Sequence, residues 1–294
     1  MAIKRARIDW RANYFAIQDE ALGTYRYRID DSLEIGWQEY PEVVDISLGT
    51  LCRGGCSYCY ASATSSGVLY ERVVEKINRW LGDMSLNRRP FQVAFGGGGE
   101  PTMHPEFIGA LYACSSWGTV PNYTTNGLGL TAAILDATRA VCGGVAVTAH
   151  SHLPWRKGVT RLLGAGVRTN LHVIVGQQGS AERALRLRRE FPEVESVVLL
   201  PLVATGFASS CAPVEEEVMG AVRIANQVPG FAIGAMYKPY IARYPAEFKK
   251  FSLYDEALYS GYLVLGDPPQ MFVSSFDLVT RSPAPRNEGQ RRRL

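Results

Sequence analysis

The chain has 294 residues, of which 47% are hydrophobic and 20% are charged, and its formal net charge is +3. This composition is that of a globular protein, and it excludes a disordered tail protein, a collagen-like fibre and a coiled coil. The chain begins MAIKRARIDWRANYF, without the apolar segment of a secretion signal, and its most apolar stretch, residues 197–208, is too short to span a bilayer. We therefore expect a cytoplasmic protein that has no membrane contact.

Positive charge is concentrated at the two ends of the chain. Residues 1–11 and 282–294 each carry a net charge of +3, which leaves about −3 for residues 12–281. A nucleic-acid-binding protein usually carries its basic residues as a stripe on a folded face, whereas chain ends are commonly mobile. We therefore interpret the two basic ends as solvated segments, with a contact to RNA or DNA as the alternative.

The predicted elements follow one another in a regular order. The chain up to residue 40 is expected to form a small strand-rich extension. From Glu42 onward, β-rich runs alternate with segments of helical period, and this alternation predicts a parallel sheet with crossover helices. The predicted strands are 43–49, 91–97, 120–126, 144–150, 169–175 and 196–202, and the predicted helices are 69–81, 105–115, 131–141, 153–163, 181–191 and 214–227.

The alternation stops after Gly230, where aromatic segments predict extra strands and loops that close one end of the molecule. The aromatic side chains of this region are expected to pack together, while a lid over a pocket and a platform for a nucleobase are alternatives. We accordingly divide the chain into an N-terminal extension (1–41), a core (42–228) and a C-terminal cap with a basic tail (229–294).

Six βα units form either an open doubly wound sheet or a partial barrel, and periodicity alone does not separate these two folds. In both folds the functional residues are expected at the carboxyl ends of the strands.

A cluster of cysteines follows the first core strand. Cys52, Cys56 and Cys59 form a CxxxCxxC motif on a short loop in which Gly54 and Gly55 allow the backbone to fold back. Three thiolates can hold a four-iron cluster and leave one iron open, whereas a structural zinc site needs four ligands and no second CxxC is present. Reduced buried cysteines and an incomplete zinc loop remain alternatives.

The other three cysteines, Cys114, Cys142 and Cys211, stand singly in the sequence. We expect them to be small, buried, apolar side chains. A role as a metal ligand or as a radical donor is the alternative.

A glycine run ends the second core strand. Residues 96–99 are four consecutive glycines, followed by Glu100 and Pro101. Such a run lets the backbone approach a ligand closely. A phosphate-binding loop would use the same property, but the Lys-Ser/Thr pair of that loop is absent here.

With CxxxCxxC after the first strand, GGEP after the second and six βα units, residues 43–207 resemble the radical S-adenosylmethionine (radical SAM) enzymes. The resemblance implies an α/β fold, a partial (β/α)6 TIM-like barrel with an N-terminal lead-in and a C-terminal cap. It implies two cofactors, a 4Fe-4S cluster and S-adenosylmethionine (SAM). The compact layout is similar to that of small stand-alone members, some from phage genomes.

The resemblance also assigns roles to residues. It implies that Cys52, Cys56 and Cys59 are the cluster ligands and that Gly98, Gly99 and Glu100 form the backbone edge that holds the methionyl amino group. It further implies that Tyr58 and Pro201 lie against the adenine, and that Asn126, Thr148 and His150 contact the ribose or the carboxylate of SAM. A structural, hydrogen-bonded histidine is the alternative for His150 and the favoured interpretation of His172, which is otherwise a possible pocket residue. His104 is expected to shape a turn.

The implied activity is reductive cleavage of SAM to a 5′-deoxyadenosyl radical, which abstracts a hydrogen from a substrate. The substrate class stays open between a peptide or protein and a nucleotide or nucleic acid. The implied electron donor is a one-electron carrier such as flavodoxin or ferredoxin. A non-catalytic iron-sulfur and SAM-binding protein that senses redox state or iron is the alternative.

Overall fold

A computed structural model describes residues 3–36, 40–251 and 260–272 of the chain. The basic segment 282–294 and part of the aromatic region after Gly230 lie outside these residues. The first three strands, β1 (Ile3–Asp9), β2 (Tyr14–Asp19) and β3 (Thr24–Arg28), form a separate antiparallel sheet in the order β1-β2-β3. The predicted strand-rich extension is thus confirmed.

The six predicted core strands are present within three residues of their predicted ends. They are β4 (Val43–Ser47), β5 (Gln92–Phe95), β6 (Val120–Thr125), β7 (Val145–Thr148), β8 (Thr169–Val175) and β9 (Ser196–Pro201). The six predicted helices are also present, as α1 (Val73–Gly82), α2 (Phe107–Ser116), α3 (Ala132–Val141), α4 (Arg156–Gly164), α5 (Ser180–Glu190) and α6 (Glu215–Gln227). Within the described residues, no helix is both long and apolar enough to cross a membrane.

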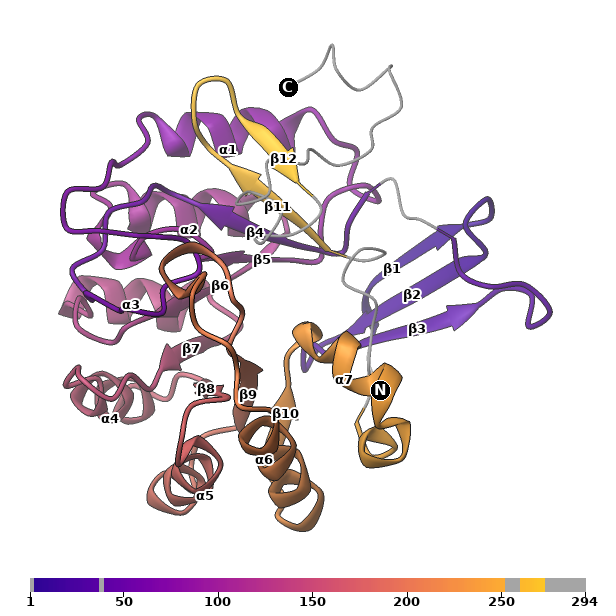
Figure 1. The fold of residues 1–294 in the computed structure, drawn as a ribbon. Helices are drawn as coiled ribbons and strands as arrows, with labels where there is room; N and C mark the ends of the chain where they lie inside the picture. The colour runs from indigo at the N-terminus through magenta and orange to yellow at the C-terminus, as the bar shows by residue number, and fades with distance from the viewer. Residues whose placement is uncertain (1–2, 37–39, 252–259, 273–294) are drawn as a thin grey trace.

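The core strands belong to one curved, mostly parallel sheet of nine strands, in the order β10-β9-β8-β7-β6-β5-β4-β11-β12. Helices α1 to α6 cover its convex face (Figure 1). Because helices α1 to α6 lie on one face of this curved sheet, and no pairing joins its edges β10 and β12 within the described residues, it is a partial barrel rather than an open doubly wound sheet, which has helices on both faces.

The chain after residue 230 does more than cover one end. Strand β10 (Phe231–Ile233) pairs with β9, and the hairpin of β11 (Ser260–Val264) and β12 (Gln270–Phe272) extends the sheet beyond β4. Between them lie α7 (Lys238–Arg243) and the 3-10 helices η3 (Ala235–Tyr237) and η4 (Pro245–Phe248). The described part of the expected cap therefore adds strands at both edges of the barrel.

Successive side chains of each core strand point alternately toward the helices, where the hydrophobic core lies, and toward the concave side of the sheet. In β8, Leu171, Val173 and Val175 are fully buried in the cluster shared with the helices. The residues between them, Asn170, His172 and Ile174, face the concave side, because successive side chains of a strand point to opposite faces. The concave side is therefore lined partly by polar groups.

The basic start of the chain is not a solvated segment, so that interpretation was wrong for Arg5 and Arg7. The guanidinium of Arg5 donates to the carbonyls of Leu86, Arg89, Pro90 and Gly118, and that of Arg7 donates to those of Tyr40, Asn87 and Arg89. These contacts attach the three-stranded sheet to the amino ends of the barrel strands.

Candidate functional site

The three clustered cysteines lie on a loop that leaves β4 at the carboxyl edge of the sheet. The loop is closed by backbone hydrogen bonds from Thr50 N to Val68 O (2.7 Å) and from Cys52 N to Thr64 O (2.8 Å). Gly55 has a φ of 62°, which is the left-handed conformation that glycine adopts without strain. From the far side, Phe207 N, in the 3-10 helix η2 (Gly206–Ala208) after β9, donates to Cys59 O at 3.0 Å. The loop is therefore held by its own backbone hydrogen bonds and by a contact from the segment that follows β9.

Each of the three sulfur atoms faces an N–H donor. Gly54 N lies 3.3 Å from Cys52 Sγ, and Ala63 N lies 3.5 Å from Cys59 Sγ. The ring nitrogens of His150 lie 3.5 and 3.9 Å from Cys56 Sγ. Hydrogen bonds to sulfur are typical of iron-sulfur sites, where they stabilise the charge of the thiolates. The chemistry of this loop therefore fits an iron-sulfur cluster.

Burial controls the ionisation of these thiols. It raises the pKa of Cys52 and raises that of Cys56 to about 12, and the nearby cysteines add to both shifts. The free thiols of Cys52 and Cys56 therefore keep their protons at neutral pH, and a metal must displace these protons to bind. In the described part of the chain, no three His, Cys, Asp or Glu side chains are placed to hold a single metal ion. In a four-iron cluster each cysteine binds a different iron, so the sulfurs need not converge on one point.

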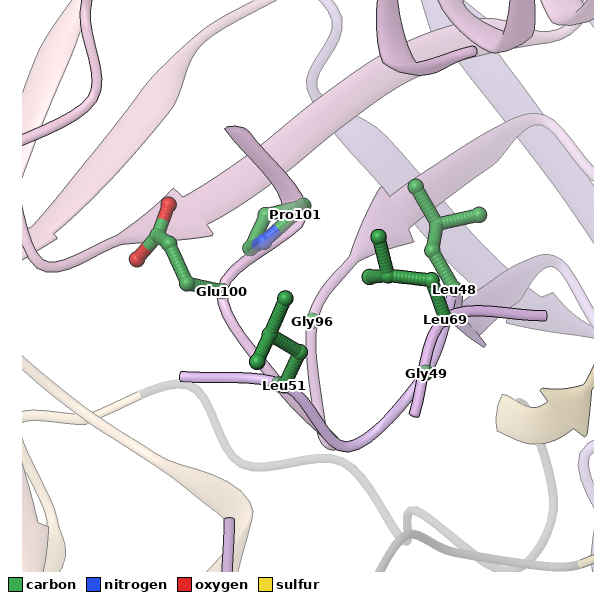
Figure 2. A pocket seen from close by; sticks show the side chains of 8 residues that line it. Leu48, Gly49, Leu51, Leu69, Gly96, Glu100 and Pro101 are labelled. Carbon is green, nitrogen blue, oxygen red and sulfur yellow. The ribbon is translucent and has the colours of Figure 1, made fainter. Parts of the chain in front are cut away.

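The glycine run packs directly against the cysteine loop. Gly99 N donates to Gly49 O at 2.7 Å, and Glu100 N donates to Leu51 O at 2.8 Å. A Cβ at Gly99 would lie 2.3 Å from Leu51 O, and one at Gly98 would lie 2.2 Å from Ser47 Oγ. Figure 2 shows Leu51 beside Gly96 and Pro101 in the small cavity between the two segments. Gly98 and Gly99 thus allow the backbone of the glycine run to contact the backbone of the cysteine loop, and this packing role does not depend on a bound ligand.

Glu100 connects the ends of two neighbouring strands. Its side chain is buried and accepts hydrogen bonds from Thr102 N (3.3 Å), Thr102 Oγ1 (2.7 Å), Thr125 Oγ1 (2.7 Å) and Asn126 N (2.7 Å). Burial raises the pKa of Glu100, and these donors partly offset the shift. Asn126 in turn places its Nδ2 3.9 Å from Cys52 Sγ. The carboxylate therefore positions the β6 end beside the cysteine loop.

A group of aromatic and basic side chains lies at the end of β7. Tyr58 Oη is 2.9 Å from His150 Nδ1, and the ring of His152 packs against both residues. His152 Nε2 also contacts Gly54 O at 2.8 Å. Arg183, on α5, bonds to the carbonyl of Ala149 and lies near Tyr58. Burial lowers the pKa of His150 to about 4, so this imidazole is neutral at physiological pH.

Sequence reasoning missed His152 and Arg183. A second histidine two residues after His150 was an available signal for the first. No signal existed for Arg183, which is one of several arginines on α5.

The remaining predicted residues occupy different places. Thr148 ends β7 and lies in register with His172 of β8. Pro201 shares a strand face with Leu199, which packs toward the helices. The SAM contacts predicted for Tyr58, Gly98, Gly99, Glu100, Asn126, Thr148, His150 and Pro201 stay predictions.

Two of the structural interpretations are confirmed. His104 shapes a turn, with its Nε2 at 2.8 Å from Tyr70 O and its Nδ1 accepting from Glu106 N. Cys114 is fully buried, as expected of a core side chain, whereas Cys142 and Cys211 are only partly buried.

Comparisons with known proteins agree with this geometry. The model of the Radical SAM superfamily matches residues 46–151, which contain the three cysteines and the glycine run. A search of curated proteins found no significant match.

Among solved structures, Streptococcus suis SuiB bound to precursor peptide SuiA has a TM-score of 0.64 at 15% identity, over 85% of this chain and 63% of SuiB. SuiB bound to S-adenosylmethionine has a TM-score of 0.58 at 16% identity, over 76% of this chain and 58% of SuiB. The chain thus spans less than two thirds of the length of SuiB, and at this identity the likeness concerns the fold. Members of the matched superfamily use a 4Fe-4S cluster and SAM. Residues 46–151 therefore carry a radical SAM domain, and the chain shares the fold of SuiB.

Proposed function

We propose that the protein is a radical SAM enzyme in which Cys52, Cys56 and Cys59 hold a 4Fe-4S cluster. The observation that supports this most directly is the cysteine loop itself, which lies at the carboxyl edge of the barrel with an N–H donor facing each sulfur. When bound and reduced by one electron, such a cluster supplies the reductive cleavage of SAM to a 5′-deoxyadenosyl radical, which abstracts a hydrogen from the substrate.

The residues around the loop orient and shield this chemistry. Glu100 accepts a hydrogen bond from Asn126 N, and the Asn126 side chain contacts Cys52, so the end of β6 lies beside this cysteine. The glycine run is hydrogen-bonded to the backbone of the cysteine loop. We infer that Gly98, Gly99 and Glu100 offer backbone groups to the amino group of SAM, and that Tyr58 lies on the adenine side. Asn126, Thr148 and His150 lie at the ends of the neighbouring strands β6 and β7, and we infer that they contact the ribose or the carboxylate. The barrel wall would keep water from a reactive intermediate.

The substrate is proposed to be a peptide or protein. SuiB, which has the same fold, has been solved with a precursor peptide bound. A nucleotide or nucleic-acid substrate is the second candidate. Both require a one-electron donor of the flavodoxin or ferredoxin kind.

Anaerobic reconstitution with iron, sulfide and a reductant tests the proposal. We expect about four irons per chain and the formation of 5′-deoxyadenosine from SAM. Cys56→Ala should lose both, whereas Cys142→Ala, which changes a thiol at the opposite end of the barrel, should keep both. Iron and bound SAM without 5′-deoxyadenosine would favour a non-catalytic sensor. Zinc without iron after anaerobic purification would contradict both functions.

A further inference from the structure

The three sulfurs differ in the source of their hydrogen-bond donors. Cys52 and Cys59 face backbone amides of their own loop, those of Gly54 and Ala63, and the side-chain amide of Asn126 also lies 3.9 Å from Cys52. Cys56 instead faces the imidazole of His150, 94 residues away in the sequence, at 3.5 Å from Nδ1 and 3.9 Å from Nε2. In the tautomer whose Nδ1 accepts from Tyr58 Oη, the ring proton is on Nε2, 3.9 Å from the Cys56 sulfur.

His150 is fixed in this position through both its ring and its backbone. Tyr58 Oη lies 2.9 Å from His150 Nδ1, and Trp155 Nε1 donates to His150 O at 2.8 Å. The ring of His152 packs beside it, with centroids 5.5 Å apart, and is itself anchored at Gly54 O. A donor held in this way loses little conformational entropy when it forms a hydrogen bond.

We propose that His150 donates an N–H hydrogen bond to the Cys56 thiolate and thereby raises the reduction potential of the cluster, with Tyr58 as the positioning residue that orients the ring. Reduction adds negative charge to the cluster and to its thiolates. A donor at sulfur therefore stabilises the reduced state more than the oxidised state. The inference rests on the proposed function, because it requires a cluster on these cysteines.

The test is a spectroelectrochemical titration of the reconstituted full-length protein without SAM or substrate, with the EPR signal of the reduced cluster as a second readout. His150→Leu should lower the midpoint potential and alter the EPR signal. His150→Gln should retain most of the wild-type potential, because its carboxamide can donate to sulfur. Tyr58→Phe should lower the potential by a smaller amount, and His172→Leu, a matched change on the neighbouring strand, should leave it unchanged.

The outcomes separate this inference from the proposed function. A wild-type protein without a 4Fe-4S cluster would end the proposed function itself. Wild-type iron content together with an unchanged potential in His150→Leu would overturn the inference alone. If His150→Leu holds too little iron to titrate, Tyr58→Phe decides: a lowered potential supports the hydrogen-bond chain, and an unchanged one overturns it.

Discussion

At the scale of single residues, Glu100 shows how a buried charge can build a site without touching the reaction. Two of its four hydrogen bonds come from backbone amides, and the other two come from threonine hydroxyls. A buried carboxylate is costly unless such donors surround it. Its structural role, to join the ends of β5 and β6, follows from contacts between residues about 25 positions apart, which the GGEP motif alone does not reveal.

A second residue, His172, makes the stability of the fold depend on pH. Burial lowers its pKa to about 4 from 6.5. As the pH falls below about 6.5, the unfolded chain takes up a proton here that the folded chain refuses until about pH 4. The contribution of the neutral, buried His172 to the free energy of unfolding is therefore fully present above pH 6.5 and is lost as the pH falls from 6.5 to 4.

Lowering the pH from 7 to 4.5 should decrease the free energy of unfolding in both the wild type and His172→Leu. We expect the decrease to be about 2 kcal/mol smaller in His172→Leu, which has no imidazole to protonate at this position. Urea denaturation at the two pH values measures both decreases. Equal decreases in the two proteins would mean that His172 titrates normally in the folded state.

At the scale of elements, the site depends on the contact between two loops that leave neighbouring strands. The cysteine loop after β4 and the glycine run after β5 share two backbone hydrogen bonds, Gly99 N to Gly49 O and Glu100 N to Leu51 O. This contact needs glycine because the loops are too close for a side chain. The position of the three sulfurs is thus set by a backbone surface as well as by their own spacing.

Gly99→Ala tests this contact. The added methyl would lie 2.3 Å from Leu51 O, so the loops must separate. We expect the free energy of unfolding to fall by about 2–4 kcal/mol and the iron content after reconstitution to fall with it. Gly164→Ala is the control, because nothing lies within 4 Å of its added Cβ, and it should be neutral or slightly stabilising. Similar effects in the two variants would show that the loop contact is unimportant.

Local patterns were sufficient to predict the six βα units. The strands and helices between residues 43 and 227 depend on alternation and helical period, which are visible in short windows. The cysteine motif likewise placed Cys52, Cys56 and Cys59 together. Contacts between distant segments were not predictable: Tyr58 and His150 meet across 92 residues, and β11 joins β4 across more than 200. Such pairings depend on the curvature of the sheet, which brings distant segments together.

At the scale of the whole molecule, the barrel is covered at its amino end by a sheet that comes first in the chain. The turn after β2 reaches the barrel through Ala21 O, which accepts from Arg168, and Leu22 O, which accepts from Gln92. Arg26 forms a bidentate ion pair with the buried Glu42 at 3.1 and 2.7 Å. These contacts indicate that the first sheet and the barrel unfold together.

Arg7→Met tests whether the two parts form one cooperative unit. Methionine keeps an apolar stem against Phe91, whose ring lies 5.0 Å from the Arg7 guanidinium, but it removes the donors to Tyr40, Asn87 and Arg89. The loss of these three hydrogen bonds should lower the free energy of unfolding by about 3 kcal/mol, still in a single transition, although Arg89 O keeps its bond from Arg5. Arg11→Met, at an exposed position, should change it by less than about 0.5 kcal/mol. Differential scanning calorimetry of both variants gives the answer: a separate low-temperature transition in Arg7→Met, with an unchanged main transition, would show that the first sheet folds as an independent appendage.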